Sequence, residues 1–255
     1  MPATRTALPE AFLTTPIAHR AYHDRAQGRP ENSRAAIRAA IAAGYGIEID
    51  LQPSADGKAM VFHDYDLARL TGAEGMIRMR KAADLAELPL IGGDEGIPSF
   101  AEVLEIVAGQ VPLLVEIKDQ DGLLGPGVGA LEAAAVADLK GYKGPVALMS
   151  FNPNSVRTCA GLAPEIPRGL TTCSFRPADW RGVPKQRLDR LARIPDADPV
   201  GASFISHEHR DLDRPRVQEL KDRGLAILCW TIRSAEEEDR ARRIAQNVTF
   251  EGYAA

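Results

Sequence analysis

Residues 46–51 read Gly-Ile-Glu-Ile-Asp-Leu, a short segment in which apolar and acidic side chains alternate. Residues two apart in a β-strand share a face, so Glu48 and Asp50 point the same way. The aliphatic side chains between them indicate that the other face is covered too, as in an inner strand of a barrel. Two neighbouring carboxylates in such a place are unfavourable without a counter-charge, and a hard divalent cation with oxygen ligands would supply one.

Short apolar or β-branched segments recur along the chain and alternate with helical patterns. The strand candidates are residues 16–19, 46–51, 111–117, 145–149, 167–170, 202–206, 226–230 and 247–250. The helix candidates are residues 34–43, 100–108, 128–139, 153–160, 215–223 and 235–244. This alternation predicts parallel strands joined by crossover helices, and eight strands favour a closed (β/α)₈ TIM barrel over an open doubly wound sheet.

The length of 255 residues suits one such barrel, and no segment has the composition of a linker, so we expect a single domain over residues 1–255. One irregular stretch, residues 71–98, interrupts the alternation and predicts a small insertion between the second and third barrel strands. The loops that follow barrel strands shape the active sites of this architecture. We therefore expect residues 71–98 and 21–29 to govern substrate selection.

Composition excludes several classes of protein. The net charge of −4, from 31 Lys+Arg against 35 Asp+Glu, argues against nucleic acid as a partner. The three cysteines are odd in number and form no CxxC pair, which indicates neither a disulfide framework nor a zinc site but a reducing compartment. Residues 1–15 lack the apolar run of a secretory signal, and no apolar stretch is long enough to form a transmembrane segment. We expect a cytoplasmic protein, and nothing in the sequence indicates a homo-oligomer.

Further polar residues stand where the predicted strands end. His19 and Arg20 end the first strand, and a second histidine, His63, ends a short strand over residues 61–64. Glu116 and Lys118 share a face at the end of the third barrel strand. Because parallel strands end at the same edge of a barrel, these side chains are expected near the two carboxylates of residues 46–51.

The ordered set of motifs resembles the signature of the glycerophosphodiester phosphodiesterase family. Its parts are His19-Arg20, Pro30-Glu31-Asn32, Glu48-x-Asp50, Asp56-Gly57, His63-Asp64, Glu116-x-Lys118 and Trp230-Thr231, which together cover nearly the whole chain. The resemblance implies hydrolysis of a small-molecule glycerophosphodiester to glycerol 3-phosphate and an alcohol. It implies Mg²⁺ or Ca²⁺ held by Glu48, Asp50 and Glu116. It also implies His19 and His63 as the acid–base pair, with Arg20 and Lys118 on the phosphate.

The residue types suit this chemistry independently of the resemblance. A phosphodiester anion repels nucleophiles, so a metal ion and cations must take up charge in the transition state. The leaving alkoxide needs a proton and the attacking hydroxyl must lose one, and two imidazoles can divide these tasks. The related phosphoinositide phospholipases suggest a variant in which a hydroxyl of the substrate attacks first, and the sequence leaves open whether that hydroxyl or water attacks.

Several interpretations stay open at this point. Trp230 is expected either to line the substrate pocket or to pack within the barrel, and Asp64 either to support the metal site or to orient a loop. His207, His209 and His23 are polar rim residues or a secondary metal site. Two rival functions are a phospholipase that acts on lipid or lysolipid head groups, and a non-catalytic barrel that binds phosphodiesters. The chain departs from the family pattern at Ala21, where glycine is common, and at residues 248–252, which replace a frequent Thr-Asp-x-Pro ending.

Overall fold

A computed structural model describes residues 3–255 of the chain, so residues 1 and 2 of the predicted domain lie outside the described part. Its parallel strands are β1 (Ile17–Ala18), β2 (Gly46–Pro53), β4 (Leu113–Ile117), β5 (Val146–Ser150), β6 (Arg168–Thr172), β7 (Phe204–Glu208), β8 (Ala226–Ile232) and β9 (Asn247–Phe250). Each strand pairs with the next, and β1 pairs with both β2 and β9, which closes the sheet into a barrel. All eight predicted strands and the (β/α)₈ barrel are confirmed.

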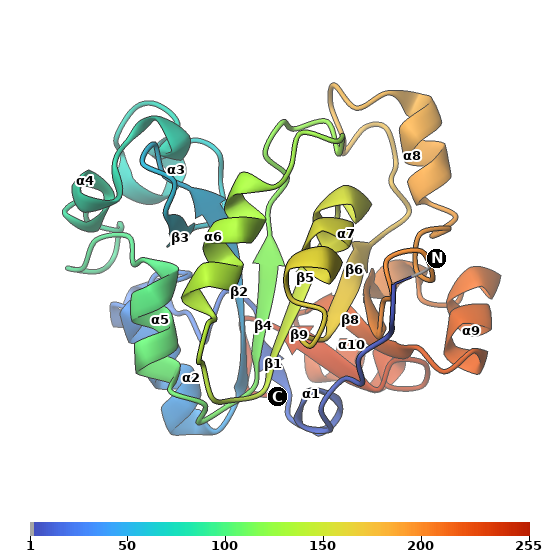
Figure 1. Cartoon of the computed structure of the whole chain (residues 1–255). Coiled ribbons are helices and arrows are strands. Elements are labelled where there is room, and N and C mark those ends of the chain that lie inside the picture. Colours follow the sequence, from blue (N-terminus) through green and yellow to red (C-terminus); the bar gives the residue numbers. More distant parts are fainter. Residues whose placement is uncertain (1–2) are drawn as a thin grey trace.

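Helices surround this barrel (Figure 1). They are α2 (Arg34–Ala43), α5 (Phe100–Val107), α6 (Ala130–Asp138), α7 (Pro153–Leu162), α8 (Lys185–Leu191), α9 (Pro215–Asp222) and α10 (Ala235–Ala241). Six of the seven were predicted. The sequence of α8, Lys-Gln-Arg-Leu-Asp-Arg-Leu, was not recognised because only its two leucines are buried, which leaves too weak an apolar pattern.

Local sequence fixes the start and end of the helix that follows β1. The Ser33 hydroxyl accepts a hydrogen bond from the Ala36 amide at the start of α2. Gly44 ends the helix with a φ of +74°, a conformation that costs glycine little. This helix packs Ala36, Ile37 and Ala40 against the outside of the barrel.

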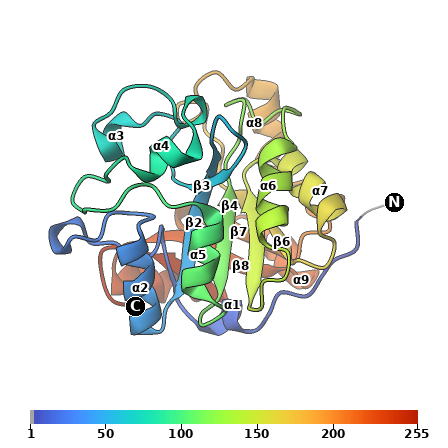
Figure 2. The same ribbon diagram turned by 60° about the vertical axis from the view of Figure 1, so that its left-hand side comes forward.

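The core has two layers, one on each side of the sheet. The larger layer lies between the barrel and its helices. The smaller one fills the barrel interior with side chains that include Leu114, Phe204 and Leu228. Phe12, in the short helix α1 (Ala11–Thr14), is fully buried against this interior cluster. Strand β4 points toward the upper end of the barrel, and helix α1 lies at the opposite, lower end (Figures 1 and 2). Packed side chains therefore fill the lower end, and the upper end is left for a site.

The predicted insertion lies between β2 and β4, where it was expected. Residues 59–61 form β3 (Ala59–Val61), which pairs antiparallel with β2. The short helices α3 (Ala68–Thr71) and α4 (Ala82–Ala86) and a 3₁₀ turn at Ile77–Met79 follow it. These elements enclose a small apolar cluster of their own. Both ribbon views place α3 and α4 beside the upper end of the barrel (Figures 1 and 2).

No helix within residues 3–255 combines the length and the apolar character that crossing a membrane would require.

Candidate active site

Three carboxylates meet inside the upper barrel. Glu48 and Asp50 lie on β2 and Glu116 lies on the adjacent β4, where Asp50 and Glu116 are register partners. One oxygen from each side chain lies within 4.8 Å of one from each of the others. All three residues are at most 5% exposed. The predicted ligand set is therefore assembled in one place.

Neighbouring groups hold these carboxylates in position. The Asn32 side-chain amide donates to Asp50 Oδ2 over 2.9 Å, and the Arg20 backbone amide donates to Glu48 Oε2 over 2.8 Å. Lys118 Nζ lies 2.7 Å from Asp50 Oδ1 and also contacts Glu116 Oε1. Asp50 and Glu116 therefore share the Lys118 cation, while among the described residues no cationic side chain forms an ion pair with Glu48.

This difference appears in the pKa values of the two carboxyls on β2. Burial, followed by repulsion from Asp50 and Glu116, holds the pKa of Glu48 well above its ordinary value. Burial also acts to raise the pKa of Asp50, but Lys118, His63 and Arg20 outweigh it and hold that pKa below the ordinary range. A cluster of oxygen donors that contains a buried carboxylate without a cation is a suitable site for a hard divalent ion.

Each of the two predicted catalytic histidines contacts a carboxylate through the same ring nitrogen. His19 Nδ1 lies 2.6 Å from Glu251 Oε2, and His63 Nδ1 lies 2.6 Å from Asp64 Oδ1. Burial lowers the pKa of His19, and the hydrogen bond to Glu251 offsets part of this effect. The lowered pKa favours a neutral His19 ring near pH 7, with Nδ1 turned toward the carboxylate.

Arg20 reaches the carboxylate cluster through an unusual turn. Arg20 and Ala21 both have positive φ, +50° and +64°, which explains why glycine is common at the second position. The Arg20 guanidinium contacts Glu31 Oε1 over 2.7 Å and lies 3.7 Å from Asp50 Oδ2. Its buried Nε has no hydrogen-bond partner among the described residues, so it remains available to a ligand.

All eight residues predicted for the site line one pocket of about 190 Å³. They are His19, Arg20, Glu48, Asp50, His63, Glu116, Lys118 and Trp230. The hydroxyls of Ser206 and Thr249, which also line it, are buried without a hydrogen-bond partner in the described structure. The pocket thus combines acids, cations, imidazoles and free hydroxyls, the groups needed to bind a charged diester and transfer protons.

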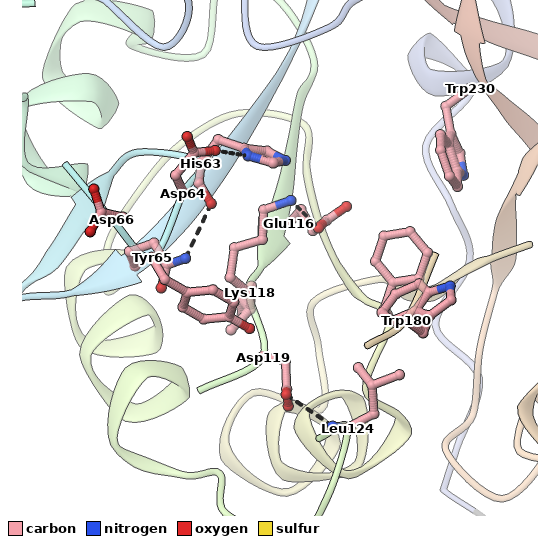
Figure 3. A pocket seen from close by; sticks show the side chains of 13 residues that line it. His63, Asp64, Tyr65, Asp66, Glu116, Lys118, Asp119, Leu124, Trp180 and Trp230 are labelled. Carbon is pink, nitrogen blue, oxygen red and sulfur yellow. Dashed lines mark hydrogen bonds and ion pairs between the residues drawn. The ribbon is translucent and has the colours of Figure 1, made fainter. Parts of the chain in front are cut away.

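A larger pocket of about 590 Å³ adjoins the first and shares His63, Glu116, Lys118, Phe151 and Trp230 with it. His63, Glu116 and the Lys118 ammonium lie at one end of it, Tyr65 on one side and Trp180 on the other (Figure 3). The wall that contains Trp180 is aromatic, because the Phe151 ring lies 5.0 Å from Trp180 and 5.5 Å from Trp230. Trp230 therefore both packs against its neighbours and lines the pocket.

The predicted specificity loops do not reach these pockets. No residue of 71–98 or 21–29 lines either pocket, and the expected role of both loops in substrate selection stays a prediction. The first loop instead folds over its own apolar cluster beside β3. The larger pocket takes its far wall from Leu124, in the loop after β4, and from Trp180, in the loop after β6.

The suggested grouping of His207, His209 and His23 is also not formed. His207 is fully buried in β7, where Nδ1 contacts the Thr172 hydroxyl over 2.8 Å and Nε2 contacts the Asp211 carbonyl over 3.1 Å. It is a core histidine whose two ring nitrogens are both occupied. His23 lies instead beside His19 and Glu251.

Three residues that contact the site stand outside the predicted set of site residues. Asp64, expected either to support the metal site or to orient a loop, contacts His63 Nδ1 over 2.6 Å. Asn32 belongs to one of the motifs but had no predicted role, and its position at a helix start gave no indication of its contact with Asp50. Glu251 lies in the segment 248–252 that departs from the family pattern, but nothing in the sequence linked it to His19, from which 232 residues separate it.

Comparisons with known proteins agree on one family. The family model described as the glycerophosphoryl diester phosphodiesterase family matches residues 19–248. A relative named glycerophosphodiester phosphodiesterase, from Caldanaerobacter subterraneus subsp. tengcongensis, is 32% identical over 235 residues, which are 89% of each chain. A solved phosphodiesterase of Oleispira antarctica, in complex with the product sn-glycerol-3-phosphate, is 27% identical with a TM-score of 0.73 and 94% of each chain covered. A solved glycerophosphodiester phosphodiesterase of Thermotoga maritima shares the fold, with a TM-score of 0.68 and 21% identity. The match covers 92% of this chain and 94% of the Thermotoga maritima chain.

Proposed function

The chain belongs to the glycerophosphoryl diester phosphodiesterase family, and from this premise we propose that it hydrolyses glycerophosphodiesters with one divalent ion and two histidines. Its activity is that of a glycerophosphodiester phosphodiesterase. The products would be glycerol 3-phosphate and an alcohol. The observation that carries this proposal is the single pocket in which three carboxylates, two histidines and three cationic side chains meet.

Glu48, Asp50 and Glu116 would hold the ion, either Mg²⁺ or Ca²⁺, through carboxylate oxygens. The unpaired charge on Glu48 supports this assignment, because a divalent ion would offset the repulsion that raises its pKa. When bound, such an ion supplies positive charge that stabilises the charge developing on the phosphoryl oxygens.

Arg20 and Lys118 are proposed to bind the diester phosphate. Both line the small pocket beside the carboxylates, and the Arg20 Nε has no partner among the described residues. The free hydroxyls of Ser206 and Thr249 line the same pocket and can donate to further phosphoryl oxygens.

His19 and His63 are proposed to move the two protons of the reaction. One imidazole takes the proton of the attacking hydroxyl as the new P–O bond forms, and the other gives a proton to the alcohol oxygen as the old P–O bond breaks. In each ring Nδ1 contacts a carboxylate, which leaves Nε2 to exchange protons with the substrate.

The alcohol is proposed to occupy the larger pocket. This pocket begins at His63, Glu116 and Lys118 and extends between Tyr65 and Trp180 (Figure 3), so an alcohol leaving from a bound phosphate would face it. A phospholipase that acts on lipid or lysolipid head groups remains the alternative activity. A cytoplasmic location is proposed because Cys159, Cys173 and Cys229 are all free and buried, as in proteins of reducing compartments.

The histidine roles are tested by His19→Ala and His63→Ala, with His209→Ala as a matched control outside both pockets. Each of the first two variants should lower kcat about 10²- to 10⁴-fold with little change in KM, whereas His209→Ala should leave kcat unchanged. A diester with a nitrophenol leaving group should restore activity to the variant that lacks the acid and not to the other. Unchanged kcat in both variants would refute the roles, and a wild-type protein that binds diesters without cleaving them would support the non-catalytic alternative.

A further inference from the structure

The backbone brings Glu251 to His19 although the two residues stand at opposite ends of the chain. The His19 amide donates to the Phe250 carbonyl over 2.8 Å, across the pairing of β1 with β9 that closes the barrel. The Glu251 amide donates to the Ile232 carbonyl at the end of β8 over 2.9 Å. Glu251 is therefore fixed at the mouth of the barrel, beside the strand end that carries His19.

Both oxygens of the Glu251 carboxylate have a partner. Oε2 lies 2.6 Å from His19 Nδ1, and Oε1 lies 2.7 Å from Nη2 of Arg233. The side chain is 20% exposed. Burial acts to raise the pKa of Glu251, but its hydrogen bond to His19, the nearby His23 ring and the charge of Arg233 outweigh burial and hold the pKa below the ordinary range. The group is a fixed anion at neutral pH.

The second histidine of the pocket repeats this arrangement with different residues. His63 Nδ1 contacts Asp64 Oδ1, and Asp64 Oδ2 contacts the Arg69 guanidinium. In both cases a ring nitrogen contacts one oxygen of a carboxylate and a guanidinium contacts the other, and Arg69 in addition donates to Asp64 Oδ1 over 2.9 Å. Because the same pairing of imidazole and carboxylate occurs on two unrelated loops, it indicates that each carboxylate orients the histidine it contacts.

We propose that Glu251 is a positioning residue for His19 in the hydrolysis proposed above. An anion at Nδ1 keeps the proton on that nitrogen, so Nε2 of the neutral ring presents its lone pair to the pocket. The same anion stabilises the imidazolium that forms when His19 takes up a proton, and it fixes the plane of the ring. The inference rests on the proposed catalytic role of His19, which Glu251 supports without touching the substrate.

A double-mutant cycle tests this role with Glu251→Ala and with the isosteric Glu251→Gln, each made in the wild-type and the His19→Ala backgrounds. Glu165→Gln, an exposed site, is the matched control. In the wild-type background, Glu251→Ala should lower kcat about 10- to 100-fold with KM within about 2-fold. Glu251→Gln should have a smaller effect, because its amide oxygen still accepts from Nδ1. In the His19→Ala background neither substitution should lower kcat further by more than about 2-fold, because residues that act as a unit are not additive.

Nitrogen NMR of the resting protein supplies a measurement that does not depend on turnover. The signals of His19 are those absent from the His19→Ala spectrum. In the wild type, neutral His19 should carry its proton on Nδ1, and Glu251→Ala should lower the pKa of His19 because an anion that stabilises the imidazolium is lost. Arg20, Asp50 and His23 also lie near this ring, and Arg233 pairs with Glu251; all four are unchanged in both proteins.

An equal loss of kcat in both backgrounds, or a His19 proton on Nε2 in the wild type, would overturn the inference. If the wild-type protein proved inactive on diesters, the proposed function would fail, while the NMR result would still decide whether Glu251 sets the protonation of His19.

Discussion

Glu48→Gln is expected to stabilise the metal-free protein and to abolish its response to divalent ions. The substitution keeps the shape of the side chain and an oxygen that can accept the Arg20 amide, but it removes the negative charge. In the metal-free protein that charge has no cationic partner among the described side chains and faces two other carboxylates. Substitutions of buried polar groups normally destabilise a protein, so the direction of this effect is diagnostic.

The magnitude follows from the geometry of the cluster. At an effective dielectric constant of about 20, two unit charges separated by 4.8 Å repel each other by about 3.5 kcal/mol. Partial protonation of Glu48 and the nearby Lys118 offset part of this repulsion. We therefore expect a gain of about 1–3 kcal/mol in the free energy of unfolding, or about 2–10 °C in Tm for a chain of this size.

One series of thermal unfolding experiments measures both the stability of the metal-free protein and its response to divalent ions. In excess chelator at pH 7, Glu48→Gln should unfold at a higher temperature than the wild type, and Glu165→Gln should match the wild type. Saturation with Mg²⁺ or Ca²⁺ at about 100 times Kd should stabilise the wild type by about 2.7 kcal/mol, or about 5–10 °C, and leave Glu48→Gln nearly unchanged.

The pH dependence in chelator gives the sign of the Glu48 contribution. The pKa of Glu48 is raised in the folded state. The contribution of this side chain to the stability of the wild type is therefore fully present below the ordinary pKa of 4.5, and it is lost as the pH rises through the raised pKa. The advantage of Glu48→Gln over the wild type should therefore grow as the pH rises. A variant that is less stable than the wild type in chelator, or that keeps the full response to metal, would refute the assignment of Glu48 as a ligand.

Three further predictions concern different parts of the structure. Asn32→Ala should weaken metal binding about 10- to 100-fold in calorimetric titration, because the amide that orients Asp50 is lost; unchanged affinity would contradict this. Phe12→Ala should lower the free energy of unfolding in urea by about 3–5 kcal/mol, because a fully buried ring is removed from the lower barrel. Trp180→Ala should raise KM for diesters of large alcohols and leave KM for small ones unchanged, since its ring walls the larger pocket; an equal change for both would place the alcohol elsewhere.

The barrel could be predicted from sequence because its signals are local. Each strand is a short apolar segment bounded by turn residues, and the period of two places Glu48 and Asp50 on one face. Parallel strands end at one edge of a barrel, so residues at several strand ends could be assigned to a common pocket from the order of the strands alone. All eight predicted site residues line that pocket.

What the sequence did not reveal depends on contacts between distant segments. Glu251 contacts His19 only because β9 closes the barrel against β1. The aromatic wall at Trp180 lies in an irregular loop after β6, where no periodicity marks which side chain turns inward. The loop at 71–98 resembled an active-site insertion, but its buried leucines and isoleucines pack on one another.

The most direct test of the central claim is the release of glycerol 3-phosphate from sn-glycero-3-phosphocholine by the purified protein. Turnover would be followed in excess chelator and again after Mg²⁺ or Ca²⁺ is restored. The account predicts no product in chelator, recovery of turnover when one of the two ions is restored, and no recovery for Glu48→Gln. Full turnover in chelator, or no product from any glycerophosphodiester with either ion present, would contradict it.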